Sequence, residues 1–320
     1  MLHYEPKDLS VPEVHRLLLG GVAPRPIALV STISKDGINN LSPFSFFNAF
    51  GANPPIVAFS PSRRGKDATL KDTYNNLIAT KECVIQVVTH PMVEQVSLAS
   101  AEFPPEYDEF IKSGLTPVES DLVKPKRVKE SPFQMECKVL EIKNFGDGGA
   151  SANLVICEVL KFHAAEDIFT NGIIDPNKID LVARMSGDFY SRAASGVFVV
   201  EKPIGKKCIG YDQVPKHIRE SEIYSANDLG KFGNSESIPD DNEVQEFIKK
   251  IKEETLEQFE SGYDAFLRYQ RLSDYKRMLK AALKLPENQK RNIELSVKCA
   301  LKNNDMDFAW KAALYAATIK

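Results

Sequence analysis

The stretch from Arg25 to Ser62 constrains the fold most, because it has the pattern of three β-strands joined by two tight connections. Residues 27–34 are rich in β-branched and apolar side chains, which favour a pleated, half-buried surface. Lys35-Asp36-Gly37 supplies a hairpin turn, since glycine tolerates a positive φ. Residues 40–48 interleave Ser and Asn with Phe, and Pro54-Pro55 ends that segment before a third apolar strand. The front of the chain therefore predicts consecutive strands.

The remainder of the first 200 residues continues this pattern. Further strands are predicted over residues 82–88, 133–145 and 153–164, and short helices over residues 10–20, 68–80 and 92–101. Many strands, few helices and no regular strand–helix alternation favour an antiparallel barrel over a doubly wound sheet. The sequence holds neither a GxGxxG motif after a strand nor a P-loop.

The composition changes after Pro203. Apolar residues that include Phe259 recur at three- and four-residue steps near the C-terminus, which predicts three or four amphipathic helices. Pro286 and Asn303-Asn304 mark breaks between them, and we find no sequence repeat among them. The predicted organisation is a barrel domain over residues 1–204, an irregular connecting segment over residues 205–240 and a helical extension over residues 241–320.

The composition also excludes several classes of protein. A chain of 320 residues with 43% hydrophobic residues is long enough to bury a sizeable core. A net charge of −3 gives no nucleic-acid footprint, and no apolar run approaches the roughly 20 residues of a membrane helix. Five cysteines without a CxxC motif, and histidines without metal spacing, predict neither a disulfide framework nor a metal site. The N-terminus lacks a secretory layout, so we expect a cytoplasmic protein.

Four ordered motifs then point to one family. They are Arg25-Pro26-Ile27-Ala28-Leu29-Val30-Ser31-Thr32, Asn40-Leu41-Ser42-Pro43-Phe44-Ser45-Phe46-Phe47-Asn48, Pro54-Pro55, and Lys71-Asp72-Thr73 with Asn76. With them the chain resembles the flavin reductase-like, FMN-binding split-barrel family, related to flavoredoxin, in a longer form with a helical C-terminal extension. The resemblance implies a mainly β fold with flanking helices (α+β), namely a split β-barrel. It also implies a homodimer with FMN at or near the subunit interface.

The phosphate of FMN is dianionic near neutral pH and needs charge-assisted donors. Basic residues cluster in the loop and helix start after the third strand, where a helix N-terminus also favours an anion. A solvated basic loop is the alternative interpretation. With the resemblance, the residues expected at the phosphate are Ser31, Thr32, Ser60, Arg63, Arg64 and Lys71. Thr73 is expected near it, with local helix capping as the alternative.

The flavin ring is flat and apolar, with edges that need hydrogen bonds. Ser45, Phe46, Phe47 and Asn48 are expected to contact it, although phenylalanines at this spacing also suit a barrel core. Arg184 matches the Arg-x-x-Gly-x-x-Tyr pattern of the family, and we expect it to face the flavin or a substrate carboxylate, or else to close the barrel through an ion pair. Phe189 stands where some flavin reductases have the histidine of a Gly-Asp-His motif associated with nicotinamide binding.

The resemblance implies an FMN-dependent oxidoreductase of the NAD(P)H:flavin reductase type, in which electrons pass from a nicotinamide through flavin N5 to an unspecified acceptor. FAD, or free flavin as a substrate, is an alternative to bound FMN. Two other hypotheses stay open: an FMN-binding electron-transfer or flavin-carrier protein without NAD(P)H activity, and an interaction module that has lost flavin. No catalytic acid–base pair is evident, because the cofactor would carry the reaction. The C-terminal helices would either cap the flavin pocket or pack as an appended module.

Overall fold

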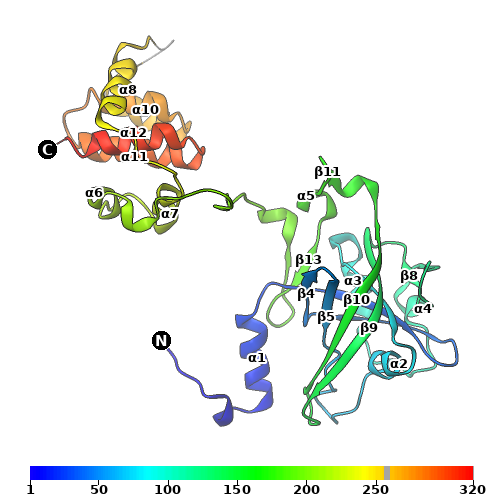
Figure 1. Ribbon diagram of the computed structural model, residues 1–320. Coiled ribbons are helices and arrows are strands. Elements are labelled where there is room, and N and C mark those ends of the chain that lie inside the picture. The colour runs from blue at the N-terminus through cyan, green and yellow to red at the C-terminus, as the bar shows by residue number, and fades with distance from the viewer. Residues whose placement is uncertain (256–259, 320) are drawn as a thin grey trace. The chain divides into compact units, whose positions relative to one another are not determined.

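A computed structural model describes residues 1–255 and 260–319, which fall into two compact units, Met1–Val199 and Val200–Lys320 (Figure 1). Within the described residues, every strand belongs to the first unit and the second is helical. Phe259, which the sequence assigned to an apolar stripe, lies outside the described residues. The predicted architecture, an antiparallel sheet with flanking helices followed by a helical C-terminal region, is confirmed.

The first unit is built on one antiparallel sheet of seven strands in the order β3-β2-β6-β9-β10-β5-β4. Burial alternates along the first half of β10, as expected when one face of a strand covers a core. The interior is filled by aliphatic, phenylalanine and cysteine side chains. The strands are β2 (Ala28–Ile33), β3 (Asn39–Phe44), β4 (Phe47–Ala52), β5 (Pro55–Phe59), β6 (Glu82–Gln86), β9 (Phe133–Phe145) and β10 (Ala152–Ala164).

The start of the chain differs from the prediction of three strands. With β1 (Arg25–Pro26), the stretch from Arg25 to Ser62 contains five strands, because residues 40–48 divide into β3 and β4 at Ser45. The two halves have different partners: β3 pairs with β2, whereas β4 pairs with β5, with Phe47 opposite Phe59. The guanidinium group of Arg25 lies 3.5 Å from Ser45 Oγ and supports this bend.

Smaller elements surround the sheet (Figure 1). A three-stranded sheet joins β1 to β13 (Val182–Arg184) and β14 (Tyr190–Arg192). Helix α2 begins at Asp72, later than the predicted start at residue 68, because Ala68 has a φ of 61° and donates its amide to Arg64 O, so a loop precedes the helix. The other elements are η1 (Pro6–Asp8), α1 (Val11–Gly21), α2 (Asp72–Thr80), η2 (His90–Met92), α3 (Val93–Leu98), α4 (Glu109–Ser113), β7 (Pro117–Val118), β8 (Arg127–Val128), η3 (Glu166–Ile168), β11 (Phe169–Thr170), β12 (Ile173–Ile174), α5 (Pro176–Ile179) and η4 (Ala193–Gly196).

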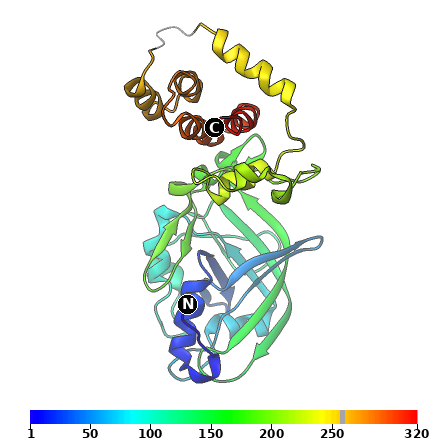
Figure 2. The same ribbon diagram turned by 90° about the vertical axis from the view of Figure 1, so that its left-hand side faces the viewer.

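The second unit has more helices than the sequence indicated. Five helices, not three or four, lie in the described part of residues 241–320, and four of them, α9 to α12, pack in chain order (orange to red in Figure 2). Residues 205–240 are only partly irregular, since they include three short helices and bury Ile218 and Phe232 in the same core. The elements are η5 (Tyr211–Gln213), α6 (Lys216–Arg219), α7 (Ala226–Gly233), α8 (Asp241–Glu253), α9 (Tyr263–Arg271), α10 (Tyr275–Ala282), α11 (Gln289–Lys302) and α12 (Met306–Ala316).

Two helical hairpins of this unit, α9–α10 and α11–α12, repeat each other. The turn of the first places Ser273 at φ 55° and the turn of the second places Asn304 at φ 57°. The next residue in each is an aspartate, Asp274 or Asp305, whose side chain accepts the amide three residues later. The aspartate amides donate to equivalent carbonyls, those of Tyr269 and Ala300.

The sequence shows the same relationship once the turns are superposed. Asp274 and Asp305 stand 31 residues apart, and each is followed at the same spacing by Lys-Ala-Ala-Leu, at residues 280–283 and 311–314. The expectation that the helices contain no repeat is therefore wrong. The repeat escaped notice because the shared residues are few and common in any amphipathic helix. Within residues 1–255 and 260–319, no helix is both long and apolar enough to cross a membrane.

Candidate functional site

The basic loop after β5 is held by its own arginines. Arg63 donates Nη1 to Ala68 O at 2.9 Å, while its buried Nε has no hydrogen-bond partner. Arg64 donates to Leu70 O at 2.6 Å and lies 3.5 Å from Asp72 and 3.4 Å from Glu102. The charge of Arg64 is therefore already balanced by carboxylates, whereas Arg63 makes no ion pair with a carboxylate among the described residues.

Lys71 follows this loop as the residue that precedes α2. Its half-buried ammonium lies 5.2 Å from the centroid of the Phe44 ring and makes no ion pair with another described residue. Burial lowers the pKa of Lys71, the charge of Arg64 lowers it further, and Glu102 opposes both effects. A half-buried cation at a helix N-terminus, without a carboxylate partner, suits a bound anion.

Ser31, Thr32 and Thr73 have a different environment from the one expected for phosphate ligands. All three are buried, and their hydroxyls already make hydrogen bonds inside the unit. Ser31 donates to Lys126 O. Thr32 and Thr73 both donate to Asn40 Oδ1, at 3.0 and 2.8 Å. The two threonine bonds fix α2, the helix that follows the basic loop, to β2 and β3, whereas the Ser31 bond joins β2 to residue 126.

The network also explains two residues of the family motif that the site prediction did not include. Asn40 accepts both threonine hydroxyls, and Asn76 donates to Thr32 Oγ1 at 3.1 Å. A small pocket of about 70 Å³ borders Lys71 above this network. It is lined by Asn40, Ser42, Arg64, Lys71, Asp72, Thr73, Ala99, Ser100, Ala101, Glu102, Phe103 and Glu109.

The segment expected at the flavin ring lies at the bend between β3 and β4. Phe46 is 37% exposed and meets the His15 ring edge-on, whereas Phe47 packs against the barrel core. Asn48 is exposed and its Oδ1 accepts the amide of Ala49. The amide of Ser60 donates to Phe46 O at 2.9 Å. The end of β5, which leads into the basic loop, and the Ser45–Asn48 bend are thus direct neighbours.

Arg184 lies on β13, directly opposite Arg25 of β1. Its guanidinium group stacks on the Tyr190 ring at 4.6 Å and lies 3.5 Å from the exposed carboxylate of Asp188. Arg25 is buried and was missed as a candidate, although it opens the first family motif. The sequence could have identified Arg25 as a candidate, because an arginine is rarely buried and here it stands at the start of an apolar strand.

One cluster in the first unit has side chains that could hold a metal: the ligand atoms of Asp121, Glu136 and His163 lie within 4.8 Å of one another. Glu136 accepts the amides of Asp121, Leu122 and Val123 and lies 2.6 Å from His163 Nε2. Asp121 also pairs with Lys161. Because these oxygens are already engaged, we assign the cluster to holding residues 121–123 against β9.

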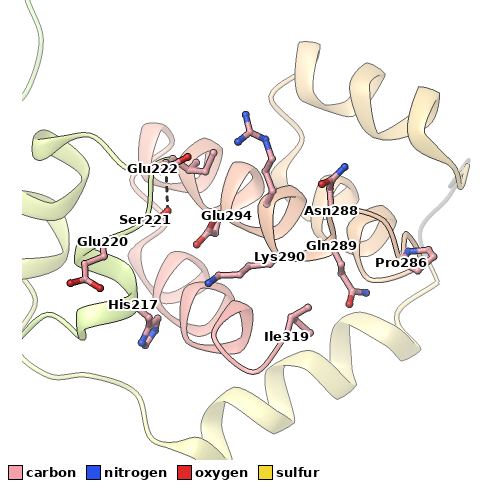
Figure 3. Close-up of a pocket in the computed structure, with 12 residues that line it drawn as sticks. His217, Glu220, Ser221, Glu222, Pro286, Asn288, Gln289, Lys290, Glu294 and Ile319 are labelled. Atoms are coloured by element: carbon pink, nitrogen blue, oxygen red, sulfur yellow. Dashed lines mark hydrogen bonds between the residues drawn. The ribbon is translucent and has the colours of Figure 1, made fainter.

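A larger pocket of about 610 Å³ lies in the second unit, between α6 and the start of α11 (Figure 3). Burial raises the pKa of Glu294, while burial and the charge of Lys290 lower the pKa of His217, whose Nε2 is buried without a hydrogen-bond partner. None of the predicted site residues lines this pocket.

Comparisons with known proteins support the first unit's assignment. The sequence profile described as flavin reductase like domain matches residues 20–178. An uncharacterised protein of Aquifex aeolicus is 39% identical over 188 residues, which cover 58% of this chain and 93% of that protein.

Solved structures agree. Nitrilotriacetate monooxygenase component B from Bacillus cereus is 30% identical with a TM-score of 0.59, covering 62% of this chain and 98% of its own. The 2-nitrobenzoate 2-nitroreductase of Pseudomonas fluorescens is 25% identical with a TM-score of 0.56, covering 63% of this chain and 96% of its own. The resemblance noted from the motifs is confirmed, and the profile match ends before the second unit begins. The chain therefore belongs to the flavin reductase-like family.

Proposed function

We propose that the first unit binds FMN and acts as an oxidoreductase of the NAD(P)H:flavin reductase type. The observation that carries the proposal is the pair of basic groups in the loop before α2. Lys71 is a half-buried ammonium without an ion-pair partner among the described residues, and Arg63 has a buried Nε without a hydrogen-bond partner. Both are donors that a phosphate would satisfy. Family membership independently supports a flavin as the small-molecule partner.

The residues around this loop would have different roles in binding FMN. Lys71 and Arg63 would hold the phosphate, whereas Arg64 mainly holds Asp72 and Glu102. Ser60, just after β5, would be a further phosphate ligand, although its hydroxyl already accepts the Asn153 amide at 3.1 Å. Ser31, Thr32 and Thr73 would act indirectly: Thr32 and Thr73 fix the helix that follows Lys71 through Asn40, and Ser31 fixes β2 to the carbonyl of Lys126. The adjoining Ser45, Phe46, Phe47 and Asn48 would contact the ring, with Phe46 exposed for stacking. Bound flavin would supply a hydride-accepting N5, which these side chains would orient and shield.

We also propose that the protein forms a homodimer. Helix α1 buries none of its residues, and Leu17, Leu18 and the adjoining Val22 are 46%, 49% and 59% exposed. Strand β4 ends the sheet with an unpaired edge and carries Phe50, which is 68% exposed. Exposed apolar groups and a free sheet edge on one unit favour association with a second copy.

A second candidate function is an FMN-binding electron-transfer or flavin-carrier protein that does not use NAD(P)H. Phe189, which replaces the histidine associated with nicotinamide binding, favours it; this side chain is 75% exposed at the turn after β13. Anaerobic stopped-flow mixing distinguishes the two. NADH or NADPH should bleach the flavin absorbance if the first proposal holds. If only dithionite bleaches it, the reductase proposal is wrong and the carrier function stands.

A further inference from the structure

Two arginines face each other across the small sheet of the first unit. Arg25 and Arg184 are direct partners in the antiparallel pairing of β1 with β13. Residues opposite each other in such a pair project from the same face, and like charges there destabilise the sheet. Burial, and then the charge of Arg184, lower the pKa of Arg25, which indicates that the two guanidinium groups interact.

The positive charge at this pair has little compensation among the described residues. Arg25 makes no ion pair with them, and the partner of Arg184 is Asp188, whose side chain is fully exposed and lies 3.5 Å away. An exposed contact of this length contributes little. The expectation that Arg184 closes the barrel through an ion pair therefore has weak support, which favours the alternative that it faces the flavin or a substrate carboxylate.

The two guanidinium groups differ in how many of their N–H donors already have a partner. Arg25 donates to the carbonyls of Leu19, Val22 and Met185 at 2.5, 2.7 and 2.9 Å. Two of those carbonyls lie at the C-terminal end of α1, where a cation is favoured. Arg25 is thus engaged in holding α1 and β13 together.

Arg184 is held in a different way. Its guanidinium group lies over the Tyr190 ring, and it makes no hydrogen bond to another described residue. A stacked arginine presents a flat fork of N–H donors that matches the two oxygens of a carboxylate. Tyr190 is 40% exposed and offers apolar surface beside that fork, and Phe189, which precedes it in the chain, is 75% exposed.

We propose that Arg184 is a binding site for the carboxylate of an organic substrate, with Phe189 and Tyr190 contacting the apolar part of the molecule. The link between this site and electron transfer rests on the proposed function, because Arg25 joins the pair to Ser45 at the bend assigned to the flavin ring. Binding of the carboxylate itself does not require flavin.

The test uses benzoate and its neutral analogue benzamide, titrated into the purified protein at low ionic strength and followed by calorimetry. The wild-type protein should bind benzoate in preference to benzamide. Arg184→Gln should weaken benzoate binding by roughly tenfold or more, the usual effect of removing a charge-assisted hydrogen-bond donor, while FMN affinity stays unchanged. Arg192→Gln is the matched control, because Arg192 lies on the adjacent β14 and is already paired with Asp180 at 2.7 Å.

Three results would overturn the proposal: no benzoate binding by the wild-type protein, equal benzoate binding by wild type and Arg184→Gln, or loss of FMN rather than benzoate in Arg184→Gln. The last result would assign the arginine to the cofactor. A protein that binds benzoate through Arg184 but fails to bind FMN would instead contradict the proposed function and leave this site standing.

Discussion

The ammonium of Lys71 lies over the Phe44 ring, 5.2 Å from its centroid, at the point where the basic loop enters α2. A cation–π contact of this kind keeps a lysine ordered without neutralising its charge. The site therefore suits an anion, and we propose that this anion is the phosphate of FMN.

Replacing Lys71 should weaken the binding of FMN but not that of riboflavin, which lacks the phosphate. Lys71→Met should weaken FMN binding by about 1.5–3 kcal/mol, the usual contribution of a charged hydrogen bond, and leave riboflavin affinity unchanged. Quenching of flavin fluorescence measures both. Lys66→Met is the control, since Lys66 lies exposed in the same loop. Equal losses for both flavins would show that Lys71 does not contact the phosphate.

The exposed apolar groups of α1 and β4 predict a subunit interface. The double variant Leu18→Asp with Phe50→Asp should convert a dimer of the 35.7 kDa chain into a monomer, because it introduces charges into a surface that would be buried. Sedimentation equilibrium gives the mass directly. Leu272→Asp, a similarly exposed apolar position on the second unit, should leave the mass unchanged. A wild-type protein that sediments as a monomer refutes the interface.

The repeated hairpins predict that equivalent substitutions have similar effects. Asp274→Ala and Asp305→Ala each remove a helix-capping side chain and should each destabilise the second unit by about 1 kcal/mol. Each side chain has one further partner, since Asp305 accepts a hydrogen bond from the Tyr275 hydroxyl and Asp274 accepts one from Arg277 Nη1 at 2.7 Å, so the two losses should be of similar size.

Urea unfolding followed by the fluorescence of Trp310, the single tryptophan of the chain, reports on this unit. Asp264→Ala, an exposed residue in the first turn of α9, is the control. A loss at only one of the two turns would argue that the hairpins are not structurally equivalent.

Glu136 predicts a specific pH dependence of stability. Burial alone would raise its pKa, but hydrogen bonds from the Asp121 amide, from His163 and from the Leu122 amide outweigh burial and hold the pKa below its usual value. A carboxyl with a lowered pKa in the folded state stabilises the protein above the pKa of the unfolded chain. That stability is lost as the pH falls through the lowered value.

Glu136→Gln should therefore lower the stability of the first unit at pH 7 by about 1–3 kcal/mol and make the remaining stability less dependent on pH below about 4.5. Urea unfolding at several pH values, followed by the strand signal in circular dichroism, tests this. Glu141→Gln, an exposed site on the same strand, is the control. An unchanged acid dependence in Glu136→Gln would exclude this role.

Local signals in the sequence predicted most of the first unit. The turn at Gly37 and the glycine-rich turn after Phe145 fix the hairpins that they join, because positive φ values favour glycine there. The division at Ser45 was not predictable, since it depends on Arg25, distant in sequence, and on the pairing of β4 with β5. The place of residues 205–240 was missed for a similar reason, because Phe232 becomes buried only against distant helices such as that of Trp310.

Prediction of the candidate site from the sequence was limited in the same way. A motif identifies neighbours in sequence but not the direction of each side chain. Ser31 and Thr32 are adjacent on β2, and successive side chains of a strand point to opposite faces, so both could not reach one phosphate. The assignment of Arg63 and Lys71 to the phosphate stays a prediction, supported by the absence of a carboxylate partner for either among the described residues and by the unpartnered Nε of Arg63. Arg25 and Asn40 were missed because their roles are to hold other groups in position.

The most direct test of the account is the flavin content of the protein itself. We expect protein purified under mild conditions to be yellow, to release FMN on denaturation, and, once stripped, to bind added FMN at one molecule per chain in a saturable titration. A colourless protein that does not bind added FMN would contradict the central claim and favour an interaction module that has lost flavin.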